Sequence, residues 1–269
     1  MKHLLNTLYV LGKNRYLSLD GENVVVLEQQ QEIGRVPLHN LQGIVTFGYT
    51  GASPALMGAC AERNIELSFM TANGRFLARV TGEVRGNVVL RKIQYRISEN
   101  AEESLKIARN FITGKVYNAR WILERAIRDY PMRVDVQKLK AKSTFLKNSL
   151  RNIQFCDSAV VLLGLEGEAA SVYFSVFDEL ILQQKNIFYF HGRNKRPPLD
   201  NVNALLSFAY SLLAGMCASA LETVGLDAYV GFYHTDRPGR ISLALDLMEE
   251  FRSVMADRFV LTLINKKIM

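Results

Sequence analysis

The first part of the chain, to about residue 95, consists of short apolar runs separated by turn residues. Runs at 16–19 and 24–27 flank Asp20-Gly21-Glu22-Asn23, a sequence typical of a turn between two strands. Ser53 followed by Pro54 predicts the N-cap and first residue of a short helix. More strands are predicted at 33–36, 43–47, 65–70 and 75–80. These elements predict a small β-sheet domain.

The spacing of apolar residues changes to a helical period from about residue 97. Apolar side chains recur every three or four positions at Leu105, Ala108, Ile112, Val116, Ala119, Leu123 and Ile127. This pattern predicts a long helix that ends before Pro131, since proline cannot continue it. Further helices are predicted at 135–150, 157–185, 203–224 and 242–264. The predicted fold class is therefore α+β, with a small N-terminal β-sheet domain at 1–95 followed by a larger all-α domain at 96–269.

Composition indicates a folded protein of the cytoplasm. Hydrophobic residues make up 49% of the chain and charged residues 22%, which is typical of a globular protein and not of a disordered one. Cys60, Cys156 and Cys217 lie far apart among apolar neighbours, as expected of buried free thiols in a reducing compartment. No apolar run approaches the roughly 20 residues that span a bilayer, so we expect no membrane association.

Positive charge is concentrated in one segment. The net charge is +7, and residues 104–151 alone contain twelve Lys or Arg residues against three acidic residues. A basic band of this kind favours a polyanionic partner such as nucleic acid, although a solvated helical face would have the same composition.

Four side chains able to hold a metal ion lie in the second half of the chain: Glu166, His234, Asp246 and Glu249. Glu166 lies in an apolar stretch, where a carboxylate must be solvated, paired or metal-bound. His234 precedes a Pro-Gly turn and can offer one ring nitrogen to a metal while a neighbour holds the other. Asp246 and Glu249 are three residues apart, so they project from neighbouring positions of one helix, and periodicity does not choose between them as ligand. Singly, each residue is more often structural than a ligand; together, in a basic chain, they indicate a divalent cation that acts on phosphate.

Motifs of several other enzyme classes are missing from the sequence. There is no Gly-x-Ser-x-Gly, no His-Glu-x-x-His and no strand-linked Gly-x-Gly-x-x-Gly. Gly114-Lys115 has no upstream glycine at the distance that a Walker loop requires. Asp200 is expected to cap the helix that follows it.

Several longer segments resemble one protein family, the CRISPR-associated integrases of the Cas-one family, in the order in which that family has them. They are LGLEGEAASVYF (163–174), PLDNVNALLSF (198–208), GFYH (231–234) and SLALDLMEEFR (242–252), with VPLHNLQGIV (36–45) resembling the family's β domain. The resemblance therefore covers nearly the whole chain. The chain departs from the family in ending soon after the helix that carries the last of these motifs, where the family has more helical sequence, so we expect a C-terminally incomplete or short member.

The resemblance implies a site and an activity. The N-terminal domain would form a homodimer, and the helical domain would hold the active site. Carried over by position, the family's metal ligands are Glu166, His234 and Glu249, with Asp246 as a supporting catalytic acid; some members have Asp where this chain has Glu249. The implied cofactor is one Mn²⁺ or Mg²⁺ per site, which suits carboxylate and imidazole ligands. The implied function is to insert new spacers into a CRISPR array by transesterification with a DNA 3′-hydroxyl, and to cleave DNA when water attacks instead.

The implied partners are double-stranded and branched DNA, a second copy of the chain and a small CRISPR-associated protein of the Cas-two family. The basic residues expected to contact the DNA backbone are Arg120, Lys138, Lys140, Lys142, Arg193, Arg196, Arg237, Arg240 and Arg252. Two alternatives stay open at this point. One is an integrase or branched-DNA nuclease outside CRISPR adaptation with the same metal site, and the other is a catalytically silent DNA-binding scaffold.

Overall fold

A computed structural model describes residues 6–82, 88–195 and 197–269. The chain divides between residues 86 and 87 into two compact units. The sequence places this division near residue 95, whereas the helical unit already includes helix α2 (Val88–Ser98). Helix α2 was not predicted because it begins with the β-branched residues Val88 and Val89, which favour a strand by propensity.

The N-terminal unit contains two four-stranded sheets. The first has the order β1-β5-β7-β8, in which β1, β5 and β7 are parallel and β8 is antiparallel to β7. Its strands are β1 (Thr7–Val10), β5 (Gly43–Phe47), β7 (Glu66–Met70) and β8 (Phe76–Val80). The second has the order β4-β3-β2-β6, with strands β2 (Arg15–Asp20), β3 (Asn23–Glu28), β4 (Gln31–Pro37) and β6 (Gly51–Ala52).

Two local predictions for this unit are confirmed. β2 and β3 form an antiparallel pair that closes with Asp20 opposite Asn23, and Gly21 in the turn has a φ of +56°, which glycine adopts without strain. Helix α1 (Pro54–Glu62) begins at the predicted proline, and the Ser53 hydroxyl accepts a hydrogen bond from the Leu56 backbone N–H at 3.2 Å. A short 3₁₀ turn, η1 (Leu38–Asn40), lies between β4 and β5.

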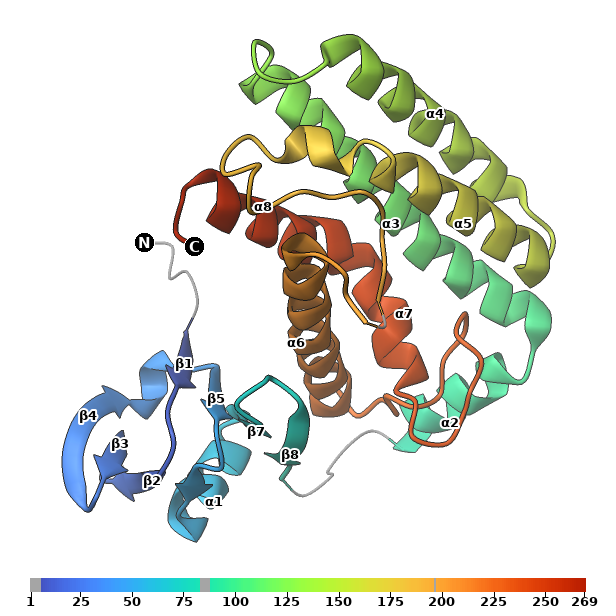
Figure 1. Ribbon diagram of the computed structural model, residues 1–269. Coiled ribbons are helices and arrows are strands. Elements are labelled where there is room, and N and C mark those ends of the chain that lie inside the picture. The colour runs from blue at the N-terminus through green and yellow to red at the C-terminus, as the bar shows by residue number, and fades with distance from the viewer. Residues whose placement is uncertain (1–5, 83–87, 196) are drawn as a thin grey trace. The chain divides into compact units, whose positions relative to one another are not determined.

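The C-terminal unit is built of helices (Figure 1). Besides α2 they are α3 (Ala101–Asp129), α4 (Val136–Phe155), α5 (Ala159–Phe174), α6 (Asn201–Thr223), α7 (Ser242–Phe251) and α8 (Arg258–Asn265). The α+β fold class, with a β-sheet domain before a helical one, is thus confirmed.

Two of the predicted helices differ from the observed ones. The helix predicted at 157–185 ends at Phe174, after which the chain forms the 3₁₀ turn η2 (Phe177–Leu180), where Phe174, Phe177 and Phe190 pack against one another. The helix predicted at 242–264 is interrupted by a π-helical segment, η3 (Arg252–Asp257), between α7 and α8. Hydrophobic periodicity does not report these changes of hydrogen-bonding pattern, because the apolar spacing continues through them.

Helix α3 is the central packing element of the helical unit, where it contacts α2, α4, α5, α7 and η3. Its buried positions include Ile112 and Leu123, both fully inaccessible, as the predicted helical period requires. Leu139 and Leu146 of α4 are also fully buried in the same core. All three cysteines are free and buried, as expected from their apolar surroundings.

Helix α6 is long and apolar enough to cross a membrane by length and composition, although a third of its most apolar window is buried. In the structure it is a core helix that packs against α7, η3 and α8. Asp200 caps it as predicted, because its carboxylate accepts a hydrogen bond from the Asn203 N–H at 2.7 Å. The sequence shows no unbroken apolar run of this length here, because serines interrupt the apolar residues of α6.

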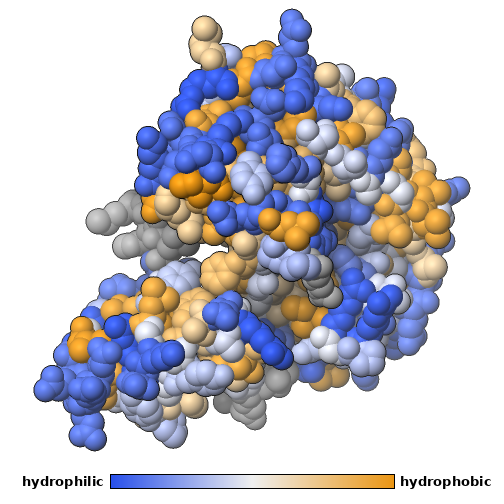
Figure 2. Space-filling model, viewed as in Figure 1, coloured by the Kyte–Doolittle hydropathy of each residue, from blue (hydrophilic) through white to orange (hydrophobic). Residues whose placement is uncertain are grey.

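Exposed apolar side chains interrupt the hydrophilic surface (Figure 2). On the helical unit they include Phe155 at the end of α4 and Val160 and Leu163 at the start of α5, which are 78%, 80% and 58% exposed. Helix α5 is apolar on all sides, so it exposes whatever α3 and α4 do not cover.

Leu146→Ala should destabilise the helical unit by about 2–5 kcal/mol, because it removes a fully buried side chain from the α3–α4 contact and leaves a cavity. Urea unfolding followed by circular dichroism measures the change. Lys147→Ala, on the exposed side of the same helix, is the control and should shift stability by less than about 0.5 kcal/mol. Equal effects of the two substitutions would contradict this core assignment.

Candidate active site

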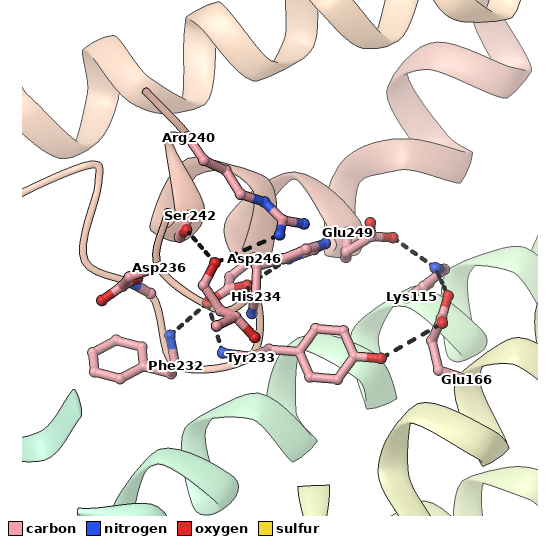
Figure 3. Close-up of polar contacts among 12 residues, drawn as sticks. Lys115, Glu166, Phe232, Tyr233, His234, Asp236, Arg240, Ser242, Asp246 and Glu249 are labelled. Carbon is pink, nitrogen blue, oxygen red and sulfur yellow. Dashed lines mark hydrogen bonds and ion pairs between the residues drawn. The ribbon is translucent and has the colours of Figure 1, made fainter. Parts of the chain in front are cut away.

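Three parts of the chain that are distant in sequence meet in the helical unit: helix α3, helix α5, and helix α7 with the segment that precedes it (Figure 3). Helix α5 provides Glu166, helix α7 provides Asp246 and Glu249, and the segment before α7 provides His234. Helix α3 adds Lys115, which was predicted only as one of the basic residues of 104–151. The structure thus brings together the four residues predicted for catalysis and metal binding.

The Asp246 carboxylate fixes the backbone of the segment that carries His234. Its Oδ2 accepts hydrogen bonds from the backbone N–H groups of Phe232 and Tyr233, at 2.7 and 2.9 Å. Its Oδ1 accepts one from the His234 N–H at 2.8 Å and lies 2.7 Å from the His234 ring Nδ1. Asp246 is fully buried, so these contacts replace the water that a buried carboxylate requires. Both Asp246 oxygens are therefore already occupied by protein hydrogen bonds.

Close packing brings this segment against α7. A Cβ atom on Gly231 would lie 2.8 Å from the Ser242 Cβ and 3.0 Å from the Asp246 Oδ2, so only glycine fits at this position. On its other side the segment is tied to α2 by Gln94, which is 2% exposed. The Gln94 amide donates to the carbonyl oxygens of Asp227 and Val230 and accepts from the Asp227 N–H.

The His234 ring is oriented by its contact with Asp246. A carboxylate can only accept a hydrogen bond, so the proton of a neutral ring lies on Nδ1 and the Nε2 lone pair is available to a ligand. Beside it, the Tyr233 hydroxyl lies 3.5 Å from the Glu166 Oε2. Burial, together with the nearby carboxylates of Glu166 and Glu249, raises the pKa of Tyr233, which keeps this phenol protonated.

Lys115 lies between the carboxylates of Glu166 and Glu249 (Figure 3). Its ammonium bonds the Glu166 Oε1 and lies 2.7 Å from the Glu249 Oε2. The same Glu249 oxygen is 3.1 Å from Nη1 of Arg252. Burial raises the pKa of Glu249, but Lys115 and Arg252 outweigh that effect and hold the pKa below its ordinary value. The two carboxylates therefore share the Lys115 ammonium, and Glu249 faces Arg252 as well.

The donor set suits Mg²⁺ or Mn²⁺. Glu166 and Glu249 are close enough to share one ammonium, and His234 keeps one ring nitrogen for a ligand. The buried Glu249 Oε2 is within ion-pairing distance of two cations yet makes no well-oriented hydrogen bond, so it can accept a further partner. In their present positions, however, no three His, Cys, Asp or Glu side chains within residues 6–82, 88–195 and 197–269 lie close enough together to hold a metal ion. At the candidate site, the Lys115 ammonium lies between the carboxylates of Glu166 and Glu249.

A second buried carboxylate supports the arginines beside the site. Asp257, at the end of η3, accepts hydrogen bonds from the hydroxyls of Tyr173 and Tyr210, at 3.0 and 2.5 Å. The guanidinium carbons of Arg193 and Arg252 lie 5.2 and 4.6 Å from the centre of the Tyr210 ring, within cation–π range. Burial raises the pKa of Asp257 to about 6, against the opposing effects of Tyr210 and Arg252.

The nine basic residues predicted to contact DNA divide into separate groups. Arg193 and Arg252 meet at Tyr210, and Arg240 lies in the segment before α7, where its Nη1 is 3.5 Å from the Thr235 carbonyl oxygen. The others lie elsewhere or are partly engaged: Arg120 and Lys140 pair with Glu124, Lys138 pairs with Glu179, Lys142 is half-buried, Arg237 is exposed, and Arg196 lies outside the described residues.

Sequence reasoning missed Lys115, Gln94, Tyr210 and Asp257. A signal for Lys115 was present: Gly114 lies in the middle of a long helix, where glycine costs about 1 kcal/mol relative to alanine. A Cβ on Gly114 would lie 2.7 Å from the Glu250 Cγ, so this glycine lets α7 approach α3 beside Lys115.

Asp246→Asn should destabilise the protein by about 2–3 kcal/mol and release His234, because an amide nitrogen would face backbone N–H groups that require an acceptor. Urea unfolding and the NMR shifts of the His234 ring measure these effects. The matched control is Asp236→Asn, since the single acceptor used there, for the Gly231 N–H, survives in asparagine. If both variants changed stability equally, the anchoring role of Asp246 would be excluded.

The raised pKa of Asp257 predicts a pH dependence of stability. Between its ordinary value of 3.8 and about 6, the native protein holds a proton that the unfolded chain has lost. The contribution of this group to the free energy of unfolding therefore falls as pH rises through that window, by at most about 1.4 kcal/mol per pH unit. Asp257→Asn should remove this part of the slope in urea unfolding at about pH 4.5 and 6.5. An unchanged slope would mean that Asp257 does not titrate there.

Comparison with known proteins gives the same family along the whole sequence. Residues 8–269 match the family model of the CRISPR associated protein Cas1. CRISPR-associated Cas1 endonucleases of Chlorobaculum tepidum and Rhodospirillum rubrum are each 49% identical to this chain, over 266 and 271 residues, and each match covers 99% of this chain and 78% of the relative.

Solved structures share the fold. A CAS1 protein from Thermotoga maritima has a TM-score of 0.79 at 22% identity, with 98% of this chain and 80% of that chain covered. A casposase bound to integration product has a TM-score of 0.79 at 26% identity, covering 98% and 74%. A Cas6-RT-Cas1–Cas2 complex contains a chain with a TM-score of 0.75 at 23% identity, covering 100% and 29%. The family match and the two 49% identities show that this chain belongs to the Cas1 family of CRISPR-associated endonucleases.

Proposed function

We propose that this protein is a metal-dependent DNA integrase that inserts new spacers into a CRISPR array and also cleaves DNA. One observation carries the proposal. The carboxylates of Glu166 and Glu249 converge on one positive charge, next to a histidine whose Nδ1 is held by a buried aspartate. This is the donor set that a divalent cation acting on phosphate requires. The similarity to a casposase bound to integration product supports the integration reaction.

Glu166, His234 and Glu249 are the residues that would hold Mn²⁺ or Mg²⁺. A bound cation supplies Lewis-acid activation of the scissile phosphate and stabilises charge on the attacking and leaving oxygens. Asp246 is a positioning residue in this proposal, since its oxygens already accept from three backbone N–H groups and lie against the His234 ring. Of Asp246 and Glu249, we therefore assign Glu249 as the third ligand.

The remaining residues of the site bind and orient the substrate. Arg252, within cation–π range of Tyr210, can contact a phosphate that flanks the reacting one, and Arg193, held at the same ring and bonded to Asn203 and Ser207, adds positive charge beside it. Arg240 carries a further positive charge on the segment of His234. In integration the attacking group is a DNA 3′-hydroxyl, which forms the new phosphodiester bond as the target-strand 3′-oxygen leaves. In cleavage a water molecule attacks in its place.

The proposed partners are double-stranded and branched DNA, a second copy of the chain that pairs through the N-terminal unit, and a small partner of the Cas2 type. The solved Cas6-RT-Cas1–Cas2 complex, which contains a chain of this fold, supports the last of these.

Glu166→Gln and His234→Ala should each lower Mn²⁺-dependent cleavage and strand transfer at least about 100-fold, because each removes a ligand while keeping the basic surface. The assay is integration of a short labelled duplex into supercoiled DNA, with and without the small partner. Glu168→Gln is the matched control, since Glu168 is exposed on the same helix two residues away. Full activity in the Glu166 and His234 variants would refute this site.

A further inference from the structure

The ammonium of Lys115 lies where the proposed metal site would have its positive charge. It bonds Glu166 and lies 2.7 Å from Glu249, and these are the two carboxylates assigned to the cation. Lys115 is only 9% exposed, so this contact replaces the water that its charge would otherwise bind. The three side chains come from α3, α5 and α7, which they connect.

The position of Lys115 depends on a close approach of two helices. Gly114 lies against the side chain of Glu250, where a Cβ would be 2.7 Å from the Glu250 Cγ, and Asn118 donates a hydrogen bond to the Glu250 carbonyl oxygen at 2.8 Å. Gly114 precedes Lys115 on α3 and Asn118 follows it, and both contact Glu250 of α7. Because Glu249 is the neighbour of Glu250, these contacts bring it within reach of the Lys115 ammonium.

One ammonium and one divalent cation compete for the same oxygens. Arg252 already lies 3.1 Å from the Glu249 Oε2, and Lys195 is close enough to Glu249, Arg252 and Lys115 to sense their charges. Adding two positive charges between Glu166 and Glu249 while Lys115 stays in place would bring like charges into contact in a poorly solvated region. The lysine stem has four flexible carbons, so its ammonium can leave the carboxylates without movement of α3.

We propose that Lys115 is an internal counter-ion of the metal-free site: it holds Glu166 and Glu249 together before the cation binds, and it is displaced from them when the cation binds. This inference rests on the proposed metal site. Before metal binding, Lys115 neutralises two carboxylates that would otherwise repel each other. After displacement its ammonium no longer has a carboxylate partner and can donate to a DNA phosphate.

A permanent structural ion pair predicts the opposite result. If Lys115 only braces the three helices, its removal loosens the site and weakens metal binding. If Lys115 competes with the cation, its removal strengthens metal binding, because the carboxylates no longer have an alternative partner. The sign of the change in affinity separates the two roles.

The test is titration of the full chain with Mn²⁺, followed by calorimetry and by the electron paramagnetic resonance signal of free Mn²⁺. Lys115→Met keeps the length of the stem without its charge, and Lys115→Gln also keeps a hydrogen-bond donor for the carboxylates. Lys106→Met is the matched control, since Lys106 lies on the same helix but pairs with Glu102 and Glu103 at the surface. Both Lys115 variants should bind Mn²⁺ at least about fivefold more tightly than the wild type, and the control should not change.

Thermal unfolding gives an independent measurement. Without metal, the Lys115 variants should melt below the wild type, because Glu166 and Glu249 lose their shared partner; with saturating Mn²⁺ the difference should shrink. A variant that folds only with Mn²⁺ would support the proposal, and one that folds under neither condition would overturn it. Unchanged or weaker Mn²⁺ binding overturns the role of Lys115 while leaving the metal site in place. No Mn²⁺ binding by either the wild type or the variants overturns the metal site as well.

Discussion

The buried carboxylate of Asp246 is the interaction on which the rest of the site depends. It accepts from three consecutive backbone N–H groups and lies against the ring of His234, so one side chain sets both the shape of an irregular segment and the orientation of its histidine. Such a segment has no helix or strand partners for its N–H groups, and without an acceptor it would be disordered or hydrated. Because Asp246 belongs to α7, the same bond fixes His234 relative to Glu249, one turn further along that helix. The candidate ligands His234 and Glu249 are thereby fixed relative to each other.

Positive charge in the site is arranged around a small number of buried acids. Asp257 accepts from two tyrosine hydroxyls, and one of those tyrosines provides the ring against which Arg193 and Arg252 stack. Arg252 in turn reaches Glu249, which also faces Lys115. Charges of opposite sign therefore alternate from the core to the site, and this alternation lets several ionic groups lie in a poorly solvated region without one unpaired charge dominating.

The sequence predicted the fold class, which the structure confirms, and a candidate set of site residues, but not how those residues are held. Helical period located α3 and α4, and local capping rules located Ser53 and Asp200, because these signals depend only on neighbouring residues. The resemblance to the family named Glu166, His234 and Glu249, since ordered motifs carry information that spacing does not. Lys115, Gln94 and Asp257 were missed because each acts through a partner at least 47 residues away in the sequence, and a basic band or an amphipathic helix would contain such residues without any role. The α2 boundary was displaced for a simpler reason: the two valines at its start favour a strand locally, so the local signal for a helix is weak there.

The π-helical segment η3 sets a limit on how the length of this chain can vary. Its hydrogen bonds span five residues instead of four, so it takes up one extra residue between the helix of Glu249 and the helix that follows. Losing one residue there would close the wide turn into an ordinary α-helical turn, so α8 would keep its phase. A second loss would have no wide turn to absorb it and would rotate the residues that follow by about 100°. A single deletion is therefore absorbed at η3, whereas a second one would take the buried carboxylate of Asp257 away from Tyr173 and Tyr210 and so remove the support of the arginines.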